Sequence, residues 1–328
     1  MKIFICGYNL YGYLNSIAKG FTKAECSVFL FSHKNISIRK LKKKGILKRA
    51  WTYLRLKQIN TLARKSFSQF NPDITLCINA SSLFPETIKS FSKRSETILW
   101  LIDSVERVAT DINTVSLFKN VLVFEPTDKE KIPNAEYLPY GFDEEIYYKR
   151  PVEKIYDISF VGAGHKERYE PLNRIAEVCK TLNIRFCVFG PFRLFNKMPW
   201  YRKKYPFLYE SIVLNRRLHP SEVNLIYNQS WININVYHPQ SKEGLNPRTF
   251  EIAGSGNFQL MEEKSSLRLF FDKDEIITYS DLDEVKEKIS YFLRQKKEIL
   301  EISKKAYNKA IQKHTFKHRA KYILEMLK

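Results

Sequence analysis

Glu243-Gly-Leu-Asn-Pro-Arg-Thr-Phe-Glu-Ile-Ala-Gly-Ser-Gly256 lies between two short apolar runs, residues 231–236 and 258–261. Runs of this length bounded by turn residues are typical of strands buried in a sheet. Asn246 is a good helix N-cap, and Pro247 suits the first helical position because its missing N–H needs no partner there. The stretch therefore predicts a strand, a helix that begins at Asn246 and a second strand, which is the repeating unit of a parallel α/β sheet.

The same alternation of short apolar runs and helical stretches extends along the whole chain. Two consecutive sets predict two doubly wound, Rossmann-like α/β domains facing a cleft, with ligands bound outside the carboxyl ends of the strands. The predicted strands cover 2–6, 26–31, 74–78, 97–102 and 120–124 in the first set and 157–161, 185–189, 231–236, 258–261 and 275–279 in the second. The predicted helices cover 13–20, 171–182, 221–229, 246–254, 282–294, 297–311 and 316–327.

A linker from Tyr137 to Pro151, with turn residues followed by charged residues, separates the two sets. We expect an N-terminal domain over 1–145, a second domain over 152–312 and a last helix within 313–328.

Glu243 and Glu251 are separated by seven residues and flank the predicted start of the helix. The first turn of a helix offers unpaired N–H groups and the positive end of the helix dipole, which together suit a phosphate. Glu251 follows about one turn later, beyond Arg248. An acid, a phosphate-binding helix start and a second acid are what a nucleotide-sugar site requires. The alternative is that the two acids merely cap and solvate the helix.

These residues resemble a known family. The Glu-x7-Glu arrangement is similar to that of retaining glycosyltransferases with two Rossmann domains, the GT-B type, and residues 246–256 are most similar to the branch named after the spore maturation protein CgeB. The resemblance extends from Phe160 to Phe316 and is thin in the N-terminal half. It implies that the domain over 1–145 binds the acceptor, that the domain over 152–312 binds the nucleotide-sugar, and that the helix within 313–328 crosses back to the first domain. The Gly-Phe-Gly usual between the acids is replaced here by Gly244-Leu-Asn-Pro247.

The resemblance implies a role for each residue of the motif. Glu251 would bind the ribose hydroxyls, because a carboxylate accepts two such bonds well. Glu243 would hold hydroxyls of the transferred sugar and stabilise positive charge at its ring, and Arg248 is grouped with it as catalytic. Lys166, Arg168 and the helix start at Asn246 would steady the departing diphosphate. The alternative for the two basic residues is a solvated pair at a helix start.

The activity implied by the resemblance is transfer of a sugar from a nucleotide-sugar to a hydroxyl of a glycan or lipid-linked acceptor, in cell-surface polysaccharide or glycoconjugate synthesis. Retention at the anomeric carbon is expected, with the leaving phosphate taking the acceptor proton, and neither a cofactor nor a bound metal is expected. The competing hypothesis is a non-catalytic glycan- or nucleotide-binding protein on the same fold. A donor of another class, glycerol-phosphate or Kdo, also stays open.

Several other residues are candidates for binding the donor or the acceptor, although some of them also have a simpler structural explanation. Gly162 and Gly164 follow a strand and could form a phosphate-binding turn, although the dinucleotide-binding pattern is incomplete. Asp103 ends a strand and could orient the acceptor hydroxyl, whereas capping the following helix is the plainer role. His165 and His238 could each donate to a phosphate or to the sugar.

Two further motifs are predicted to be structural. His219-Pro-Ser-Glu222 is interpreted as a helix start, and Asp272-Lys-Asp274 as a surface turn despite its metal-binding form. A basic and aromatic cluster over 193–204 is interpreted as a surface insertion, with contact to a sugar acceptor as the alternative.

The net charge is +20, and between Glu25 and Asp73 there are twelve Lys or Arg residues and no acid. Residues 34–65 also carry apolar residues at roughly helical spacing, which predicts a basic amphipathic segment on an anionic membrane surface. An anionic glycan acceptor is the alternative, and nucleic acid is not expected because no nucleic-acid module accompanies the charge. The residues assigned to this acceptor or membrane patch are Lys42, Lys43, Lys44, Arg49 and Trp51.

Composition sets the remaining expectations. The 328 residues, 44% of them hydrophobic, suit two globular domains. Residues 1–6 are too short an apolar run for a secretory signal, so we expect a cytoplasmic protein held on the inner face of the cell membrane. The five cysteines lie mostly in apolar runs and are predicted to be small buried hydrophobes in a reducing compartment.

Overall fold

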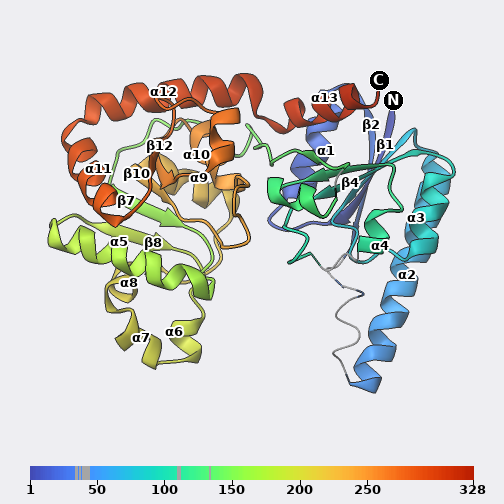
Figure 1. Cartoon of the computed structure of the whole chain (residues 1–328), viewed down its shortest axis with the longest axis horizontal. Helices are drawn as coiled ribbons and strands as arrows, with labels where there is room; N and C mark the ends of the chain where they lie inside the picture. The colour runs from blue at the N-terminus through green and yellow to red at the C-terminus, as the bar shows by residue number, and fades with distance from the viewer. Residues whose placement is uncertain (34–35, 37, 39–44, 109–111, 133) are drawn as a thin grey trace. The chain divides into compact units, whose positions relative to one another are not determined.

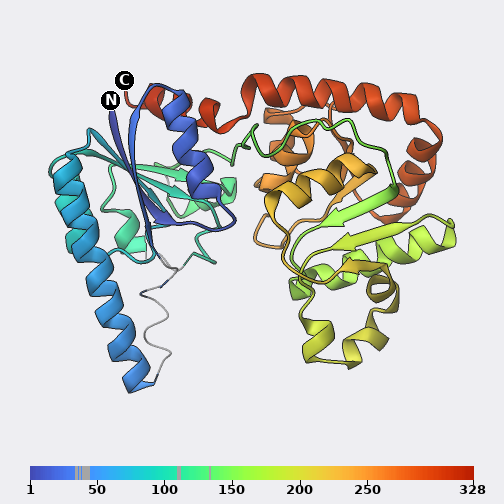
Figure 2. The ribbon, with the colours of Figure 1, turned by 180° about the vertical axis from the view of Figure 1, so that it is seen from behind.

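The computed structural model describes residues 1–33, 36, 38, 45–108, 112–132 and 134–328, which form two compact units. Unit 1 contains Met1–Tyr140, Lys242–Gly244 and Phe316–Lys328, and unit 2 contains Gly141–Ser241 and Leu245–Thr315. Each unit is built around one six-stranded parallel sheet (Figures 1 and 2).

The sheet of unit 1 has the strand order β2-β1-β3-β4-β5-β6. Its strands are β1 (Lys2–Tyr8), β2 (Ser27–His33), β3 (Ile74–Ile78), β4 (Glu96–Leu101), β5 (Asn120–Val123) and β6 (Glu136–Tyr137). Alternate residues of these strands enter two separate cores, because successive side chains of a strand point to opposite faces. The sheet is therefore buried on both faces, as its continuous apolar strands predict.

Helices cover both faces of this sheet. The helices are α1 (Tyr13–Lys23) and α13 (Phe316–Met326) over one face and α2 (Ile46–Phe70), α3 (Pro85–Ser92) and α4 (Ile112–Val115) over the other. Helices α1 and α13 lie side by side in both views (Figures 1 and 2). Gly20 permits this approach, since a Cβ there would lie 2.5 Å from the Phe316 carbonyl oxygen.

The sheet of unit 2 has the order β12-β11-β10-β7-β8-β9. Its strands are β7 (Tyr156–Val161), β8 (Phe186–Phe189), β9 (Ile212–Leu214), β10 (Ser230–Asn235), β11 (Gln259–Glu262) and β12 (Ile277–Tyr279). Its longer helices are α5 (Tyr169–Thr181), α9 (Pro220–Gln229), α10 (Pro247–Gly254), α11 (Leu282–Arg294) and α12 (Lys296–Lys313).

Three short helices follow β8, namely α6 (Leu194–Lys197), α7 (Trp200–Lys204) and α8 (Pro206–Ser211). The interpretation of the cluster over 193–204, together with the adjoining Tyr205, as a surface insertion is wrong for its tyrosines. Tyr201 and Tyr205 are buried and pack against the Tyr169 ring at centroid distances of 5.4 and 5.6 Å. These rings belong to the core of unit 2, whereas Trp200 remains exposed.

Strand order locates the place where each sheet can bind a ligand. When the strands of unit 2 are numbered from β7, their order is 3-2-1-4-5-6, so the chain connections diverge on either side of the β7–β10 pair. In unit 1 the order is 2-1-3-4-5-6, and the connections diverge between β1 and β3. Ligands of such sheets bind outside the carboxyl ends of the strands at this switch point.

The predicted fold class is confirmed by these two parallel sheets. Every predicted strand and helix listed above is present with its ends shifted by up to three residues. The strands β6 and β9 and the helices α3, α4 and α6–α8 were not among the predictions. The helix in the basic segment begins only at Ile46, and Ile38 lies in a bend. All five cysteines are buried and free, as predicted. In the described part of the chain, no helix has the length and apolar character needed to span a bilayer.

Candidate functional site

The start of α10 is fixed by a buried network of amide side chains at the end of β10. Asn246 caps the helix by accepting a hydrogen bond from the Thr249 backbone N–H at 3.3 Å, which confirms the predicted N-cap. Its Nδ2 donates to Asn235 Oδ1 at 2.8 Å, and Asn235 Nδ2 donates to Asn246, Thr249 and Gln259. Because Asn235 is the last residue of β10, the network holds the helix start at the switch point of unit 2.

Arg248 lies in the first turn of α10 and reaches the end of the neighbouring strand β7. Its Nε donates to the Val161 carbonyl oxygen at 2.7 Å, and its guanidinium lies 5.6 Å from the centroid of the Phe160 ring. A Cβ on Gly162 would lie 2.5 Å from Arg248 Nη2. The absence of a side chain at Gly162 thus makes room for this guanidinium.

A second arginine lies at the same turn. Arg168 is buried at the end of the short 3-10 helix η3 (Lys166–Arg168), and its Nη1 donates to the Ala163 carbonyl oxygen at 3.1 Å. Its guanidinium lies 5.9 Å from the same Phe160 ring. Lys166 is exposed, so the two predicted basic residues have different environments. The alternative of a solvated pair is therefore excluded for Arg168.

Gly164 has a packing reason of its own, because a Cβ there would lie 2.4 Å from the Phe192 ring. His165 and His238 lie at the ends of β7 and β10, with ring centroids 4.9 Å apart. His238 Nε2 is 3.7 Å from a carboxylate oxygen of Glu167. The structure thus brings Gly162, Gly164, His165, Arg168, His238 and Arg248 together at one switch point.

Glu251, the second acid of the motif, is a buried residue of α10. It is hydrogen bonded to Tyr147, and its charge also acts on Tyr227. Burial raises the pKa of both tyrosines, and the nearby Glu251 carboxylate raises it further. The two tyrosines therefore stay neutral, which lets Tyr147 donate its hydroxyl proton to the carboxylate.

Glu243, the first acid, belongs to unit 1, because residues 242–244 pack with that unit. The backbone N–H of Glu243 donates to Glu125 Oε1 at 3.1 Å, and that of Gly244 donates to Glu125 Oε2 at 3.0 Å. A Cβ on Gly244 would lie 2.4 Å from the Phe124 carbonyl oxygen, so glycine is required there. The chain passes from unit 1 to unit 2 between Gly244 and Leu245, inside the motif.

Asp103 follows β4 in unit 1, but the helix-capping role expected for it is wrong. A turn follows Asp103, and after it the described chain has no helix before α4 at Ile112. Its carboxylate is 3.9 Å from Arg107, and both side chains are partly exposed.

The motifs predicted to be structural are confirmed. His219 is the N-cap of α9 in a capping box with Glu222, whose pKa is lowered to about 2 by the Arg216 side chain. Asp272 and Asp274 flank a surface turn, and their carboxylates pair with lysines of α12 at 2.9 and 2.7 Å.

The predicted basic patch is only partly described. Lys42, Lys43 and Lys44 lie outside the described residues. Arg49 and Trp51 are exposed on the first turns of α2, and the Arg55 guanidinium lies 3.7 Å from the centroid of the Trp51 ring. Figures 1 and 2 show these turns extending beyond the sheet of unit 1.

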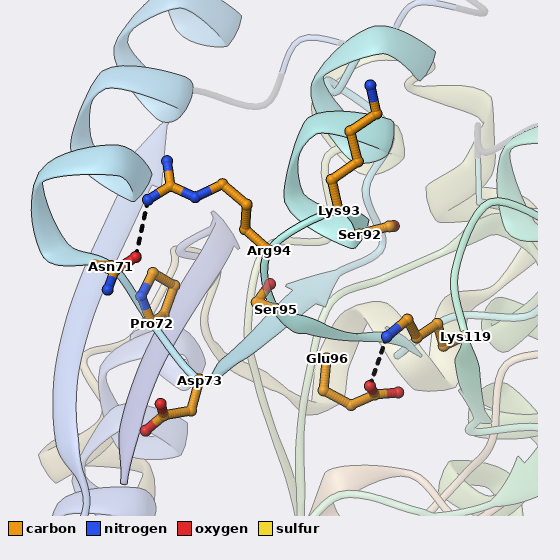
Figure 3. Close-up of a pocket in the computed structure, with 9 residues that line it drawn as sticks. All are labelled: Asn71, Pro72, Asp73, Ser92, Lys93, Arg94, Ser95, Glu96 and Lys119. Carbon is orange, nitrogen blue, oxygen red and sulfur yellow. Dashed lines mark hydrogen bonds and ion pairs between the residues drawn. The ribbon is translucent and has the colours of Figure 1, made fainter.

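A pocket of about 480 Å³ lies in unit 1, at the end of the sheet opposite to the carboxyl ends of its strands (Figure 3). Asp73 precedes β3, Glu96 begins β4 and Lys119 precedes β5, so the pocket is at the amino ends of the strands. Lys119 and Glu96 form an ion pair at 2.8 Å, and the Arg94 guanidinium donates to the neutral Asn71 Oδ1 at 2.9 Å. The pocket therefore does not coincide with the expected ligand end of the sheet.

Sequence reasoning missed three residues that support this site. Asn235, Tyr147 and Glu125 hold the start of α10, the Glu251 carboxylate and the Glu243 backbone respectively. The only sequence signal for Glu125 is its place just after an apolar run, which is the signal that singled out Asp103.

Known proteins resemble this chain in sequence over one part and in fold over the whole. Residues 168–325 match a family model described as Glycosyl transferase-like. A comparison with curated protein sequences finds no match.

Three solved structures show the likeness in fold. Sucrose-phosphate synthase from Thermosynechococcus elongatus has a TM-score of 0.69 and 9% identity, covering 99% of this chain and 98% of that one. Anabaena Alr3699/HepE in complex with UDP has a TM-score of 0.66 and 10% identity, and the match covers 100% of this chain and 99% of that one. AviGT4, a glycosyltransferase involved in avilamycin A biosynthesis, has a TM-score of 0.66 and 12% identity, and the match covers 99% of this chain and 96% of that one.

The chain therefore has the GT-B fold. The family match and this fold support the predicted enzyme class, a glycosyltransferase.

Proposed function

We propose that the protein transfers a sugar from a nucleotide-sugar to a hydroxyl of a glycan or lipid-linked acceptor. The observation that carries this proposal is the pair of arginines at the switch point of unit 2, Arg168 and Arg248, beside the start of α10. Two guanidinium groups next to a helix N-terminus provide positive charge and directed donors, which a diphosphate needs both when bound and when leaving. Solved structures with this fold include complexes with UDP and with UDP-glucose, so a UDP-sugar is the first donor to test.

The residues around this turn divide the work of holding the donor. Arg168, Arg248 and the exposed Lys166 bind the diphosphate, and Glu251 binds the ribose hydroxyls in an orientation set by its bond to Tyr147. Glu243 holds hydroxyls of the transferred sugar and stabilises positive charge at its ring. Asp103, in unit 1, orients the acceptor hydroxyl.

For the chemical course we propose the route that the family resemblance implies, in which no protein side chain acts as general base. The leaving phosphate takes the proton of the acceptor hydroxyl as the new glycosidic bond forms, and the anomeric configuration is retained. Neither a cofactor nor a metal is required, because arginines and the helix start neutralise the charge that develops on the diphosphate. We place the chain in the CgeB-like branch, in cell-surface polysaccharide or glycoconjugate synthesis. Proton NMR of the product's anomeric signal tests retention, and turnover in EDTA tests metal independence.

Thermal melting against UDP, GDP, ADP, CMP and their common sugars tests the donor assignment. A ligand that binds only the folded state stabilises it by about 2.7 kcal/mol at a hundredfold excess over its Kd. We expect one nucleotide to stabilise the wild type and to lose that effect in Glu251→Gln. If no nucleotide stabilises the wild type, the proposal fails. Binding without donor consumption in any acceptor extract favours the non-catalytic alternative.

We further propose that helix α2 holds the protein on the cytoplasmic face of an anionic membrane. One face of α2 is buried in unit 1 through residues such as Leu56, Ala63 and Phe67. A second apolar stripe faces away from it and consists of Leu47, Trp51, Leu54 and Leu62, which are 86, 55, 63 and 47% exposed. These four residues are among the apolar residues on which the predicted membrane segment was based.

Charge selects the partner of this exposed stripe. Lys48 and Arg55 lie about a quarter of a turn from it on one side, and Lys57 lies on the other. An apolar stripe between two rows of cations fits anionic headgroups, with about 1 kcal/mol contributed by each basic residue near the surface.

Co-sedimentation with vesicles tests this surface. We expect binding to vesicles of phosphatidylglycerol and phosphatidylcholine at low salt, little binding to phosphatidylcholine alone, and a large loss in Trp51→Ala combined with Leu54→Ala. Trp200→Ala is the matched control, because Trp200 is also 55% exposed but lies in unit 2. Equal binding by all variants, or none by the wild type, would exclude α2 as the anchor.

A further inference from the structure

Glu125 is a buried carboxylate that the proposed reaction has not used. It follows β5, is 1% exposed and caps the 3-10 helix η2 (Pro126–Glu130) by accepting from the Thr127 N–H and hydroxyl. A buried carboxylate is costly unless its oxygens are well hydrogen bonded. The partners of Glu125 are therefore informative about what it does.

Both oxygens of Glu125 are directed at the peptide that carries Glu243. Oε1 accepts from the Glu243 N–H at 3.1 Å, and Oε2 accepts from the Glu243 and Gly244 N–H groups at 3.3 and 3.0 Å. Hydrogen bonds to an ionised acceptor are roughly twice as strong as neutral ones. The carboxylate thus fixes two successive peptide groups, and so the direction in which the Glu243 side chain leaves the backbone.

Two neighbours make this attachment specific. Gly244 lets the peptide lie against the Phe124 carbonyl oxygen, which a Cβ would approach to 2.4 Å. Lys242 lies close enough to Glu106 for its charge to lower the pKa of that carboxyl, after the larger effect of Lys131. The segment 242–244 is therefore held in unit 1 chiefly by the backbone hydrogen bonds to Glu125, with a weaker electrostatic attraction between Lys242 and Glu106.

We infer that Glu125 is a positioning residue of the reaction, which orients Glu243 toward the transferred sugar through the peptide groups of Glu243 and Gly244. This inference rests on the proposed function. The hydrogen bonds described for Glu125 run to Thr127, Glu243 and Gly244 and not to the residues proposed to bind the nucleotide, so its removal should affect the sugar and not the nucleotide. The expected pattern separates it from Glu251, whose removal should weaken the nucleotide.

Hydrogen exchange of the ligand-free protein tests the attachment without any substrate. In Glu125→Gln an NH2 group replaces one of the two accepting oxygens. We therefore expect the Glu243 and Gly244 N–H groups to exchange roughly ten- to a hundredfold faster than in the wild type. Glu130→Gln, on the exposed end of η2, is the matched control and should not change them. Unchanged exchange at both amides in Glu125→Gln overturns the inference.

Binding of UDP and UDP-glucose tests the consequence for the sugar. We expect Glu125→Gln to bind UDP as the wild type does and to lose the part of UDP-glucose affinity that Glu243→Gln also loses. The double variant should lose no more than Glu243→Gln alone, because both changes act through one side chain. Additive losses, or an equal loss for UDP, overturn the inference.

A second variant covers the case in which Glu125→Gln does not fold. Glu125→Asp keeps the charge but shortens the side chain by one methylene, which moves the carboxylate away from the Glu243 and Gly244 N–H groups. It should therefore show faster exchange and weaker UDP-glucose binding, both to a smaller extent than Glu125→Gln. If the wild type binds neither UDP nor UDP-glucose while the exchange result holds, the nucleotide-sugar proposal fails on its own, and the role of Glu125 in the reaction is overturned with it.

Discussion

The two ends of the stretch from Glu243 to Gly256 are held by different chemistry. At its beginning, in unit 1, the backbone of Glu243 and Gly244 is held by one ionised side chain, Glu125. At the start of α10, in unit 2, Asn235 and Asn246 hold each other through neutral amides. The first end has one strong acceptor with few alternatives, and the second distributes its bonds over several side chains.

This difference suggests that the two ends have different roles: the amide network stabilises the fold, and the Glu125 carboxylate positions a residue of the site. The amide network is part of a sheet and helix junction, so its loss should reduce the stability of unit 2. The Glu125 carboxylate holds a three-residue segment that belongs to no helix or strand, so its loss should change the site more than the fold. The predictions below challenge that division.

The largest loss of stability is expected for Asn235→Ala. It removes the partner of Asn246 Nδ2 and the donor to Gln259, and unpaired buried groups cost about 1–3 kcal/mol each, so the free energy of unfolding should fall by about 3 kcal/mol. Denaturant unfolding measures this loss. Asn196→Ala, at an exposed position in α6, is the control and should change it by less than about 0.5 kcal/mol. A loss below 1 kcal/mol for Asn235→Ala would show that the network is not a main support.

The far end of the same stretch gives a pH-dependent effect. Lys154 Nζ donates to Asn257 Oδ1 and to the Ser230 carbonyl oxygen, each at 2.7 Å, and burial lowers the pKa of Lys154 to about 8. In the unfolded chain the pKa of a lysine is near 10.4. Between about pH 8 and pH 10.4 the unfolded chain therefore binds more protons than the folded protein, so the free energy of unfolding should rise with pH in this range. Relative to Lys154→Met, the wild type should gain about 2 kcal/mol between pH 8 and pH 10.

Unfolding of both proteins across this pH range measures the gain. Lys296→Met, at an exposed position at the start of α12, should run parallel to the wild type. If the difference between wild type and Lys154→Met is constant with pH, the Lys154 ammonium is not desolvated as described.

Gly244→Ala tests the carboxylate-held end. Its Cβ would meet the Phe124 carbonyl oxygen at 2.4 Å, and backbone cannot move aside as a side chain can. Overpacking of this kind costs about 1–3 kcal/mol, and the lower end applies here because residues 242–244 belong to no helix or strand that the strain could disrupt. We expect a loss near 1 kcal/mol together with faster exchange of the Glu243 amide. A larger loss would mean that the segment supports the fold of unit 1.

The sequence could predict one of these ends and not the other. Asn246-Pro247 is a local cap signal, and the alternation of strands and helices fixed the carboxyl ends of β7 and β10 as the place for ligands. Hence Gly162, Arg168 and Arg248 could be expected near one another. The burial of Arg168 was harder to predict. This side chain is only 5% exposed because it packs near the Phe160 ring, which residue spacing does not reveal.

The other end depends on contacts between distant parts of the chain. Glu125 and Gly244 are separated by 119 residues, and no local pattern joins them. The buried face of α2 was not predicted, because Leu47 and Leu56 are both apolar and only packing distinguishes the exposed residue from the buried one. Hydrophobic periodicity cannot separate two opposed apolar faces of one helix.

Gly162→Ala should have the smallest effect on stability and the clearest effect on binding. Its Cβ would meet Arg248 Nη2 at 2.5 Å, and the end of a flexible side chain can move where the Phe124 carbonyl at Gly244 cannot. The loss of stability should therefore stay below about 1 kcal/mol. The displaced guanidinium would leave the Val161 carbonyl, so UDP affinity should fall about tenfold, the worth of one charged hydrogen bond. Calorimetric titration with UDP measures the affinity. Because Gly244→Ala should leave UDP affinity unchanged, an equal loss in both variants would mean that the two ends form one support and that their different chemistry has no functional consequence.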